Sequence, residues 1–353
     1  MIESQLPRIL REGAGKYYPV VFDFDNTVVC GDIGEATLAT LINEGLIQKS
    51  TLSKSLCPDF TTSDGKAISL DVFEDPTMYY EYLLKSSGPS DPTPLSTGYT
   101  WCVEIMEGLS AFDVVEATKK AFSLSEQNVE KFISVIPGKS TYQVPFFYKE
   151  ILDLMAELIF NNYEIWVVSA SNVWTVRWMV LNALNPILKD LGTKKGILPE
   201  HVIGISTLMQ DPKGMLHKDP VLSKENPDYL NMKPEVLKSL KLTSRLHHPV
   251  SIYSGKVQSI IDYIGKKPYL SAGDSPGDHP MLMYSDYKLW LARLEKSDYQ
   301  KQTSKLITDS NRNKWVIWPT LCKKTPGIIH NMDKIDVTTS PAIQESLNFL
   351  RNF

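Results

Sequence analysis

The sequence predicts an α/β protein in which a doubly wound parallel sheet is joined to one inserted, mainly helical cap domain. Short apolar segments alternate with segments of helical periodicity in the second half of the chain. A long stretch with mainly helical patterns separates the first apolar segment from that alternation. The chain of 353 residues is also longer than one compact core needs. A main domain with a single insertion is therefore expected.

The strands of the sheet are expected to be short and apolar, because parallel strands are buried on both faces. They are predicted at 20–24, 164–169, 201–206, 269–272 and 287–292. Helical periodicity predicts the intervening helices at 34–46, 146–162, 171–184 and 254–264. The polar, proline-containing segment 207–252 is expected to form a β excursion or a long loop.

The cap domain is predicted to cover residues 37–143, which leaves 1–36 and 144–353 for the core domain. Helices are expected there at 77–85, 100–106, 111–122 and 125–135. The last of these opens with SEQN, which is similar to a capping box. The segment 86–100 is rich in Pro, Gly and Ser and is expected to be a loop.

The composition excludes several classes of protein. With 37 basic and 41 acidic residues, the net charge of −4 gives no indication of a nucleic-acid partner. The 4 cysteines, at 30, 57, 102 and 322, form no CxxC pair and are expected to be buried thiols. No stretch is apolar enough for a transmembrane segment. Because no signal sequence is visible, a cytoplasmic protein is expected, with export of a longer precursor left open, as is the oligomeric state.

Polar side chains follow the predicted strands where the strands end. They are Asp23 and Asp25 after the first strand, Ser169 after the second, and Asp274 and Asp278 after the fourth, with Lys256 opening the helix before it. Carboxyl ends of parallel strands lie side by side, so these groups are expected in one crevice. Carboxylates that lie so close repel one another unless a divalent cation binds, and a set of oxygen ligands suits Mg²⁺.

Such a site suits a phosphoryl group. The cation and Lys256 would neutralise its charge, while Ser169 and backbone amides would donate hydrogen bonds to its oxygens. One aspartate can attack phosphorus, and the aspartate two residues later can exchange protons with the leaving group and with water. Taken singly, each residue has another interpretation: 25–27 as a turn and helix cap, Ser169 as a helix N-cap, and Lys256 as a surface lysine.

The ordered set Asp23-x-Asp25-x-Thr27, Ser169, Lys256 and Gly273-Asp274-x-x-x-Asp278 resembles the four motifs of the haloacid dehalogenase superfamily. The resemblance implies a Rossmann-like core with a cap of the phosphoserine phosphatase type. It also implies a phosphatase with Asp23 as nucleophile and Asp25 as acid and base. Mg²⁺ would be bound by the Asp23 carboxylate, the Asp25 carbonyl and Asp274, with Asp278 as a ligand through water or a supporting partner.

Shorter segments resemble the bacterial phosphorylcholine phosphatase family. They are 25–27, 32–35, 79–80, 99–101, 202–208, 255–257 and 315–317. The chain departs from that family in having GDSPGDH and in showing no export signal. The resemblance implies a small phosphate ester as substrate, phosphocholine or a related amino-alcohol phosphate. Phosphoserine or another metabolite ester, a phosphoprotein, and a non-catalytic phosphate-binding module stay open as alternatives.

A trimethylammonium group needs aromatic faces and a nearby carboxylate. The predicted cap provides Tyr79, Tyr80, Tyr82, Tyr99 and Trp101, with Glu35, Glu81 and Glu104 as counter-charges. The expected substrate contacts are Thr27, Glu35, Tyr79, Tyr80, Trp101 and Ser171. The tyrosines also fit a packed helical face, and Glu35 and Asp32 fit helix N-terminal charges. Residues 47–143 contain no Arg, which argues against the carboxylate of phosphoserine.

Overall fold

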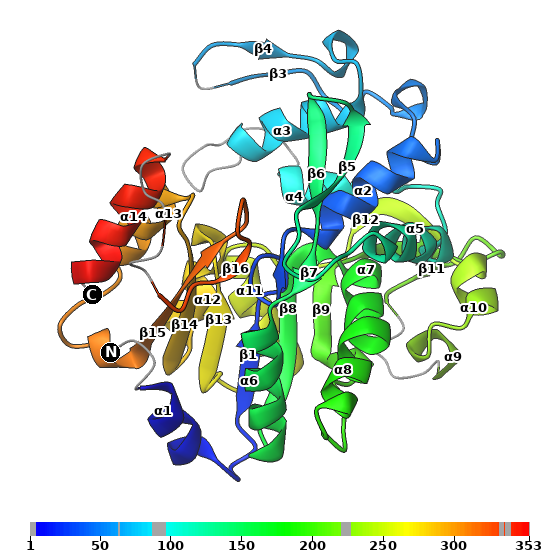
Figure 1. Ribbon diagram of the computed structural model, residues 1–353. Helices are drawn as coiled ribbons and strands as arrows, with labels where there is room; N and C mark the ends of the chain where they lie inside the picture. Colours follow the sequence, from blue (N-terminus) through cyan, green and yellow to red (C-terminus); the bar gives the residue numbers. More distant parts are fainter. Residues whose placement is uncertain are drawn as a thin grey trace.

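In the computed structural model, the first predicted strand lies in the interior of the central sheet, between β13 and β8 (Figure 1). The structure describes residues 5–62, 64–86, 97–219, 227–331, 335 and 340–352. Within these residues the sheet has seven strands in the order β16-β15-β14-β13-β1-β8-β9. Their bounds are β1 Pro19–Phe22, β8 Glu164–Asn172, β9 Val202–Ile205, β13 Leu270–Gly273, β14 Tyr287–Arg293, β15 Trp315–Leu321 and β16 Gly327–Ile328.

The strand order reverses direction at β1. The chain runs from β1 through β8 to β9 on one side, and later through β13, β14 and β15 on the other. All neighbouring pairs are parallel except β15 and β16. The prediction of a doubly wound parallel sheet is confirmed, as are its five strands; β15 and β16 were not predicted. The reversal between β1 and β13 creates the crevice in which such sheets bind ligands.

Helices cover both faces of this sheet (Figure 1). On one face Val21 and Trp166 pack with Ile260 and Met281, whereas Val20 and Phe22 belong to the core of the opposite face. The helices are α1 Leu6–Gly13, α6 Lys149–Phe160, α7 Val173–Trp178, α8 Asn185–Asp190, α11 Ser254–Ser259, α12 His279–Tyr284, α13 Ser297–Ser304 and α14 Pro341–Asn352. The helices predicted at 171–184 and 254–264 are confirmed, and both end in π-helical turns, at Met179–Leu184 and Ile260–Ile264. None of the helices in the described residues has the length and hydropathy that crossing a bilayer requires.

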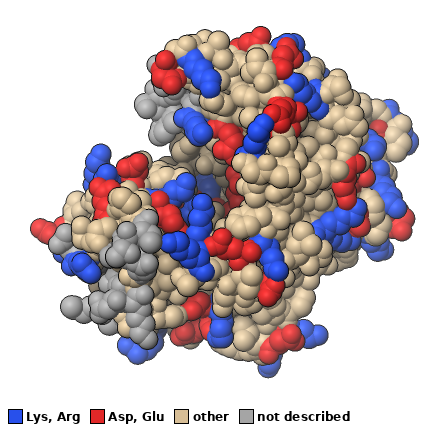
Figure 2. Space-filling model, turned by 45° about the horizontal axis from the view of Figure 1, so that its top comes forward, with Lys and Arg blue, Asp and Glu red and all other residues tan. Residues whose placement is uncertain are grey.

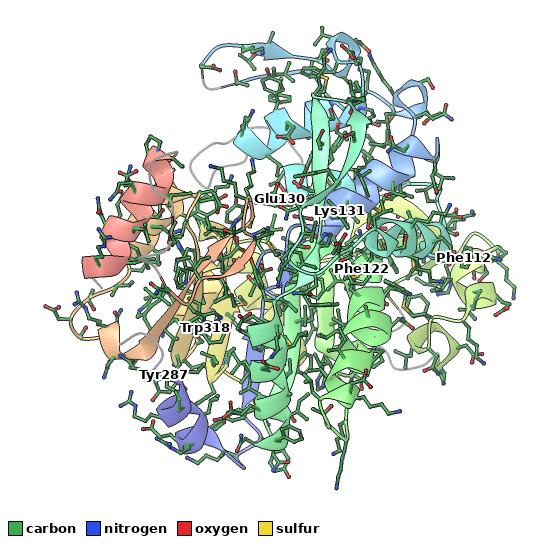
Figure 3. The ribbon with its side chains drawn as sticks, viewed as in Figure 1. Phe112, Phe122, Glu130, Lys131, Tyr287 and Trp318 are labelled. Carbon is green, nitrogen blue, oxygen red and sulfur yellow. The ribbon has the colours of Figure 1, made fainter. Side chains whose placement is uncertain are left out.

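The region predicted as a cap contains helices and hairpins. Its helices are α2 Ile33–Asn43, α3 Pro76–Ser86, α4 Gly98–Glu104 and α5 Ala111–Ser123, which match four predicted helices. Its hairpins pair β3 Phe60–Thr61 with β4 Ala67–Ile68, and β5 Lys131–Ile136 with β6 Ser140–Val144. Figure 3 labels Phe122 of α5, whose ring contacts Phe147 and Trp178 and so joins this region to the core. Residues 87–96 of the loop predicted at 86–100 lie outside the described residues.

The helix predicted at 125–135 is wrong, because the second half of that segment is strand β5. Asn128 has a positive φ of 60°, which ends any helix beginning at Ser125. The Ser125 hydroxyl donates to the carbonyl of Pro145 across the chain and caps no helix. The pairing of β5 with β6 decides the conformation, since local sequence signals yield to a tertiary partner.

The segment 207–252 forms the predicted β excursion. Strands β10 Thr207–Gln210, β11 Leu216–His217 and β12 Lys241–Leu246 make a small antiparallel sheet, with helices α9 Pro227–Leu230 and α10 Pro234–Ser239 before β12. Strand β12 also binds the chain before α5. Leu242 accepts a hydrogen bond from the Gly108 amide and donates one to Leu109, at 2.9 and 2.8 Å. The excursion therefore fastens the inserted region to the core.

A buried ion pair fixes the excursion to α7. The Arg177 guanidinium lies 2.7 Å from Asp219, and their side chains are 1% and 3% exposed. A buried pair costs most when one partner is removed, because the other charge stays buried alone. Arg177→Met is therefore expected to lower the free energy of unfolding, measured by urea denaturation, by about 3–5 kcal/mol.

The matched control is Lys149→Met, which removes the cation from an exposed pair with Asp153 whose side chains are 74% and 46% exposed. Its expected cost is below about 1 kcal/mol, because water solvates both charges. An equal loss in the two variants would show that the burial of Arg177 contributes nothing to stability.

Candidate active site

A tight loop after β1 positions the first two aspartates. The amide of Asp23 donates to the carbonyl of Ala272 in β13, at 2.9 Å, so the aspartate stays at the sheet edge. The chain then turns at Asn26, whose φ is +57°. The Asn26 amide donates to the Gly31 carbonyl at 3.0 Å, and the Gly31 amide donates to Asn26 Oδ1 at 3.3 Å. The two ends of the loop are therefore held together.

Lys256 joins the aspartates of two different strand ends. Its Nζ lies 2.7 Å from Asp23 Oδ1 and 2.6 Å from Asp278 Oδ1. Burial lowers the pKa of Lys256, but the charges of Asp23 and Asp278 outweigh it and raise that pKa above its ordinary value. Glycine is required just before the lysine, because a Cβ on Gly255 would lie 1.9 Å from the carbonyl oxygen of Val250. The close packing of this turn directs Lys256 into the sheet crevice.

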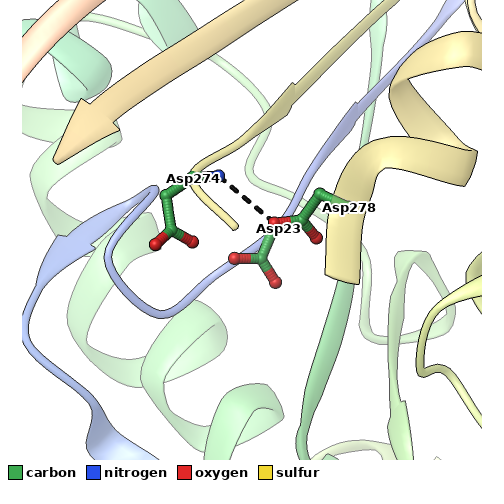
Figure 4. Close-up of side chains that lie close together, drawn as sticks. All are labelled: Asp23, Asp274 and Asp278. Atoms are coloured by element: carbon green, nitrogen blue, oxygen red, sulfur yellow. Dashed lines mark hydrogen bonds between the residues drawn. The ribbon is translucent and has the colours of Figure 1, made fainter. Parts of the chain in front are cut away.

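Three carboxylates from β1 and the loop after β13 converge around one point. Oxygen atoms of Asp23, Asp274 and Asp278 lie within 4.8 Å of one another. Figure 4 shows them together, with the hydrogen bond of 3.2 Å from the Asp274 amide to Asp278. Burial and the charge of Asp278 raise the pKa of Asp23 to about 8. Burial raises that of Asp274 to about 7, although Arg293 opposes it.

The raised pKa values mean that the anionic forms of these carboxylates are under-compensated. A divalent cation among them would remove that penalty, because its charge is the largest that such a site can hold. The donor set consists of hard oxygens, which suits Mg²⁺ or a similar ion. The residues present therefore fit a metal of this class.

Asp25 lies beside this cluster and has other partners. Its Oδ2 accepts a hydrogen bond of 2.6 Å from the Ser171 hydroxyl, and its Oδ1 accepts one of 2.8 Å from the Ile33 amide. Burial and the charge of Asp32 raise the pKa of Asp25 well above its ordinary value. Burial and the charge of Asp32 therefore favour the protonated form of Asp25.

Three predicted hydroxyl residues surround the aspartates. The Thr27 hydroxyl donates to Asp23 Oδ2 at 3.1 Å. Ser169 is fully buried, and its Oγ accepts a hydrogen bond of 3.0 Å from the Ser171 amide. Ser171 lines a cavity that opens above the aspartates, whereas Ser169 is absent from the described lining of that cavity. Ser171 therefore presents the hydroxyl that a ligand can reach.

A cavity of about 490 Å³ opens over these groups. Figure 2 shows the corresponding face, where acidic and basic side chains gather around a hollow. Helix α2, which crosses the predicted boundary at 36/37, provides Glu35 to its wall. The inserted region provides Glu81, Tyr99 and Tyr142, and the core provides Tyr253, Arg293, Lys296, Tyr299 and Lys323. Side chains of both charges and several aromatic rings therefore line the cavity above the aspartates.

Glu35 is part of an acidic group on this wall. It accepts a hydrogen bond of 3.1 Å from the Tyr80 hydroxyl. Burial, followed by the charges of Asp32 and Glu81, raises the pKa of Glu35 to about 8. Tyr142 donates to Glu81 at 3.3 Å. Asp32 also caps α2, as the alternative interpretation proposed, by accepting from the Glu35 amide at 2.8 Å.

Four of the six predicted substrate contacts are absent from the described lining of the cavity: Thr27, Tyr79, Tyr80 and Trp101. Thr27 is fully buried beneath Asp23. The Tyr79 hydroxyl donates to the Pro58 carbonyl at 2.7 Å, and Trp101 Nε1 donates to the Leu56 carbonyl at 2.8 Å. Their rings lie 5.3 Å apart in the core of the inserted region, and the described lining of the cavity includes neither. Tyr80 stacks on Trp101, and its hydroxyl contacts the cavity wall at Glu35. Tyr79 and Trp101 are therefore packed inside the inserted region, in line with the alternative interpretation of a packed helical face.

Several residues of the site were not predicted. Arg293 Nη1 lies 2.9 Å from Asp274 Oδ2. Arg293 is the last residue of β14, so the signal that identified the aspartates, a polar residue at a strand end, would also have identified it. Tyr253 directly precedes α11 and has a positive φ of 47°. For Lys296 and Tyr299 the sequence carries no signal, because their place depends on how α13 packs.

Comparison with solved structures identifies proteins of similar fold. A conserved protein of unknown function from Anaerococcus prevotii DSM 20548 is 18% identical, with a TM-score of 0.58 over 92% of this chain and 93% of that chain. A protein of unknown function from Bordetella pertussis Tohama I is 11% identical, with a TM-score of 0.47 over 85% and 97%. A phosphoserine phosphatase, solved as a phospho-aspartyl intermediate analogue, is 13% identical, with a TM-score of 0.38 over 88% and 94%.

No family model and no curated protein matches the sequence. At these identities the likeness to the Anaerococcus protein establishes the fold, and the more distant likenesses add nothing to it. What the protein does must therefore be argued from the chemistry of the site.

Proposed function

We propose that the protein is a phosphomonoesterase of the haloacid dehalogenase type, which hydrolyses a small phosphate ester through an aspartyl phosphate. One observation carries the proposal: Asp23, Asp274 and Asp278 converge within 4.8 Å, and Lys256 lies 2.7 Å from Asp23, at the base of one cavity. A carboxylate beside a buried ammonium and a cation site is the arrangement that phosphoryl transfer to an aspartate needs.

In the proposed reaction Asp23 attacks phosphorus and the alcohol leaves. Lys256 holds one oxygen of Asp23 and Thr27 the other, so the carboxylate is oriented before the substrate arrives. Asp25 would donate a proton to the leaving oxygen and later take one from the attacking water. Its raised pKa supports this role, since an acid must be protonated when the substrate binds.

The metal in this proposal is Mg²⁺, held by the carboxylates of Asp23 and Asp274 and by the carbonyl of Asp25. Asp278 would support the site through Lys256 and through its bonds to the amides of Asp274 and Ser275. Bound Mg²⁺ would neutralise charge on the phosphoryl oxygens. When the substrate binds, the Ser171 hydroxyl in the cavity wall would turn from Asp25 and donate to the phosphoryl group, and Ser169 would support Ser171.

The proposed substrate is phosphocholine or a related amino-alcohol phosphate. Glu35 and Glu81 place two carboxyl groups on the cavity wall, and Tyr99, Tyr253 and Tyr299 line the same cavity. The rings of Tyr99 and Tyr253 lie 6.3 Å apart at 72°, so two aromatic side chains meet at the cavity, and aromatic rings attract cations. These tyrosines replace Tyr79 and Trp101 as the proposed aromatic contacts.

Phosphoserine is a second candidate, favoured by the cations of the core. Arg293 and Lys296 line the cavity, so a partner for a substrate carboxylate exists although residues 47–143 contain no Arg. A phosphoprotein fits less well, because the inserted region contributes to the wall above the aspartates. A non-catalytic binding module would keep the cavity but would release no phosphate.

The nucleophile is tested by Asp23→Asn. Phosphate release from p-nitrophenyl phosphate is expected to fall by about 10⁴-fold or more, because an amide cannot attack phosphorus. In Asp25→Asn, the reaction is expected to stop after the phosphoryl group has been transferred to Asp23, because hydrolysis of the aspartyl phosphate needs the base. The phosphoenzyme should then accumulate, and intact-protein mass spectrometry should detect the added phosphoryl group. Asp298→Asn, at a side chain that is 83% exposed, is the matched control and should keep wild-type turnover. Wild-type turnover in Asp23→Asn would refute the assignment.

The metal site is tested by removing and restoring Mg²⁺. A chelator is expected to abolish phosphate release, and Mg²⁺ to restore it. Mg²⁺ should also raise the midpoint of thermal unfolding, since a ligand at a hundredfold its Kd adds about 2.7 kcal/mol to stability. Asp274→Asn should lose this rise. If it kept the full thermal response to Mg²⁺, the ion would bind elsewhere.

The substrate preference is tested by the pH dependence of KM. Glu35 binds a cation as the anion, and its pKa is raised to about 8, so the neutral form prevails at lower pH. KM for phosphocholine is therefore expected to fall by up to about tenfold per pH unit as pH rises toward 8. Glu35→Gln should flatten this dependence.

The matched substrate control is p-nitrophenyl phosphate, which carries no cation and should lack the Glu35-dependent change in KM. If phosphoserine instead has the higher kcat/KM, and Lys296→Gln raises its KM alone, phosphoserine replaces phosphocholine as the proposed substrate.

A further inference from the structure

Two cysteines that are distant in sequence meet beside the nucleophile loop. Cys30 belongs to β2 (Val29–Cys30), which pairs with β7 (Phe146–Phe147), and Cys322 directly follows β15. Cys30 is 0% exposed and Cys322 is 7% exposed. The Cys30 thiol donates to the carbonyl of Leu321, the residue before Cys322, at 3.6 Å, and the two thiols lie close enough to shift each other's pKa. The fold therefore brings two free thiols together.

The surrounding side chains hold both cysteines in this position. Gln143 Nε2 lies 3.9 Å from Cys30 Sγ and donates to the Cys322 carbonyl at 3.1 Å. The Cys322 thiol donates to Asn26 Oδ1 at 3.5 Å, and the same oxygen accepts from the amide of Gly31, the residue after Cys30. Cys30 is thus hydrogen-bonded to Leu321, the neighbour of Cys322, and Cys322 is connected through Asn26 to Gly31, the neighbour of Cys30.

Cys322 is the more reactive of the two thiols. Its hydrogen bond with Cys30 and the charge of Arg293 lower the pKa of Cys322 to about 7, although burial opposes this. The pKa of Cys30 is raised, first by the same hydrogen bond and then by burial. Since the thiolate is the species that reacts with oxidants, Cys322 is the expected point of attack and Cys30 the resolving thiol.

We propose that Cys30 and Cys322 are a redox modification site, at which hydrogen peroxide produces a reversible intramolecular disulfide. The Cys322 thiolate attacks one peroxide oxygen, giving a sulfenic acid and hydroxide, which takes up a proton to become water. The Cys30 sulfur then attacks the Cys322 sulfur and displaces the sulfenic oxygen as a second water, with the Cys30 proton. The two thiols lose two electrons in total, and one peroxide is reduced to two waters.

The disulfide would change the nucleophile loop. A disulfide holds its sulfurs at about 2.05 Å, so Cys322 gives up its hydrogen bond to Asn26. Asn26 lines the cavity and follows Asp25 directly. The nucleophile loop would then lose the hydrogen bond between Asn26 and Cys322. In its place, a covalent bond would join β2 to the residue that follows β15. The resulting loss of phosphatase activity rests on the proposed function, whereas formation of the disulfide does not.

The other two cysteines serve as internal controls. Burial raises the pKa of both Cys57 and Cys102. Among their described interactions, neither has a cysteine partner, and Trp101 and Tyr80 are their respective hydrogen-bonding neighbours. Mild oxidation should therefore leave them as thiols.

The experiment treats the reduced full-length protein with a small excess of hydrogen peroxide. Thiols are then counted after denaturation, and the cross-linked peptides are identified by mass spectrometry. Loss of two of the 4 thiols is expected, with one disulfide between the peptides of Cys30 and Cys322. Cys322→Ser and Cys30→Ser should lose the disulfide, while Cys57→Ser should retain it. Dithiothreitol should restore all thiols.

The same samples are assayed for release of phosphate from p-nitrophenyl phosphate. Activity of the oxidised wild type is expected to fall at least tenfold and to return with dithiothreitol. Peptide mapping of the wild type decides the proposal even where a serine variant fails to fold. A disulfide that includes Cys57 or Cys102, or four intact thiols after treatment, overturns the proposal. If the Cys30–Cys322 disulfide forms in a protein without phosphatase activity, the proposed function fails and the modification site stands.

Discussion

The buried ammonium of Lys256 is the interaction on which the site depends. It lies between Asp23 and Asp278, which come from the ends of two parallel strands, and all three side chains are nearly excluded from water. Without that cation the sheet edge would hold adjacent buried anions, which repel one another and favour protonation. Lys256 and Arg293 together do not offset the burial and mutual repulsion of three carboxylates, as the raised pKa values of Asp23 and Asp274 indicate. The core is therefore arranged to receive one further cation.

The inserted region completes the cavity and has its own internal support. Tyr79 and Trp101 satisfy their polar atoms with backbone carbonyls of this region, which makes them structural residues despite their aromatic character. The cavity above the aspartates is instead lined by Glu35 of α2, Tyr99 of this region and Tyr253 of the core. Strand β12 binds the chain before α5, so the wall and the floor of the cavity are connected by backbone hydrogen bonds.

The nucleophile loop is the place where the separate parts of the site meet. Its Asn26 is held by Gly31 and by Cys322, and Cys322 follows the strand beside the one that ends in Arg293. Arg293 in turn contacts Asp274 at 2.9 Å. The electrostatic environment of the proposed metal site therefore extends to the pair of thiols. A chemical change at either cysteine acts on the same loop that orients Asp23 and Asp25.

The sequence by itself determined five parallel strands of the sheet and the polar residues at their ends, because burial of parallel strands requires apolar runs and strand ends are local features. It thus predicted Asp23, Lys256 and Asp274, which the structure brings together. Only the tertiary structure decided that 131–136 is a strand and that Arg293 and Lys296, rather than Tyr79 and Trp101, line the cavity. The physical reason is that a side chain's neighbours in space depend on long-range pairing and packing, which helical spacing cannot reveal.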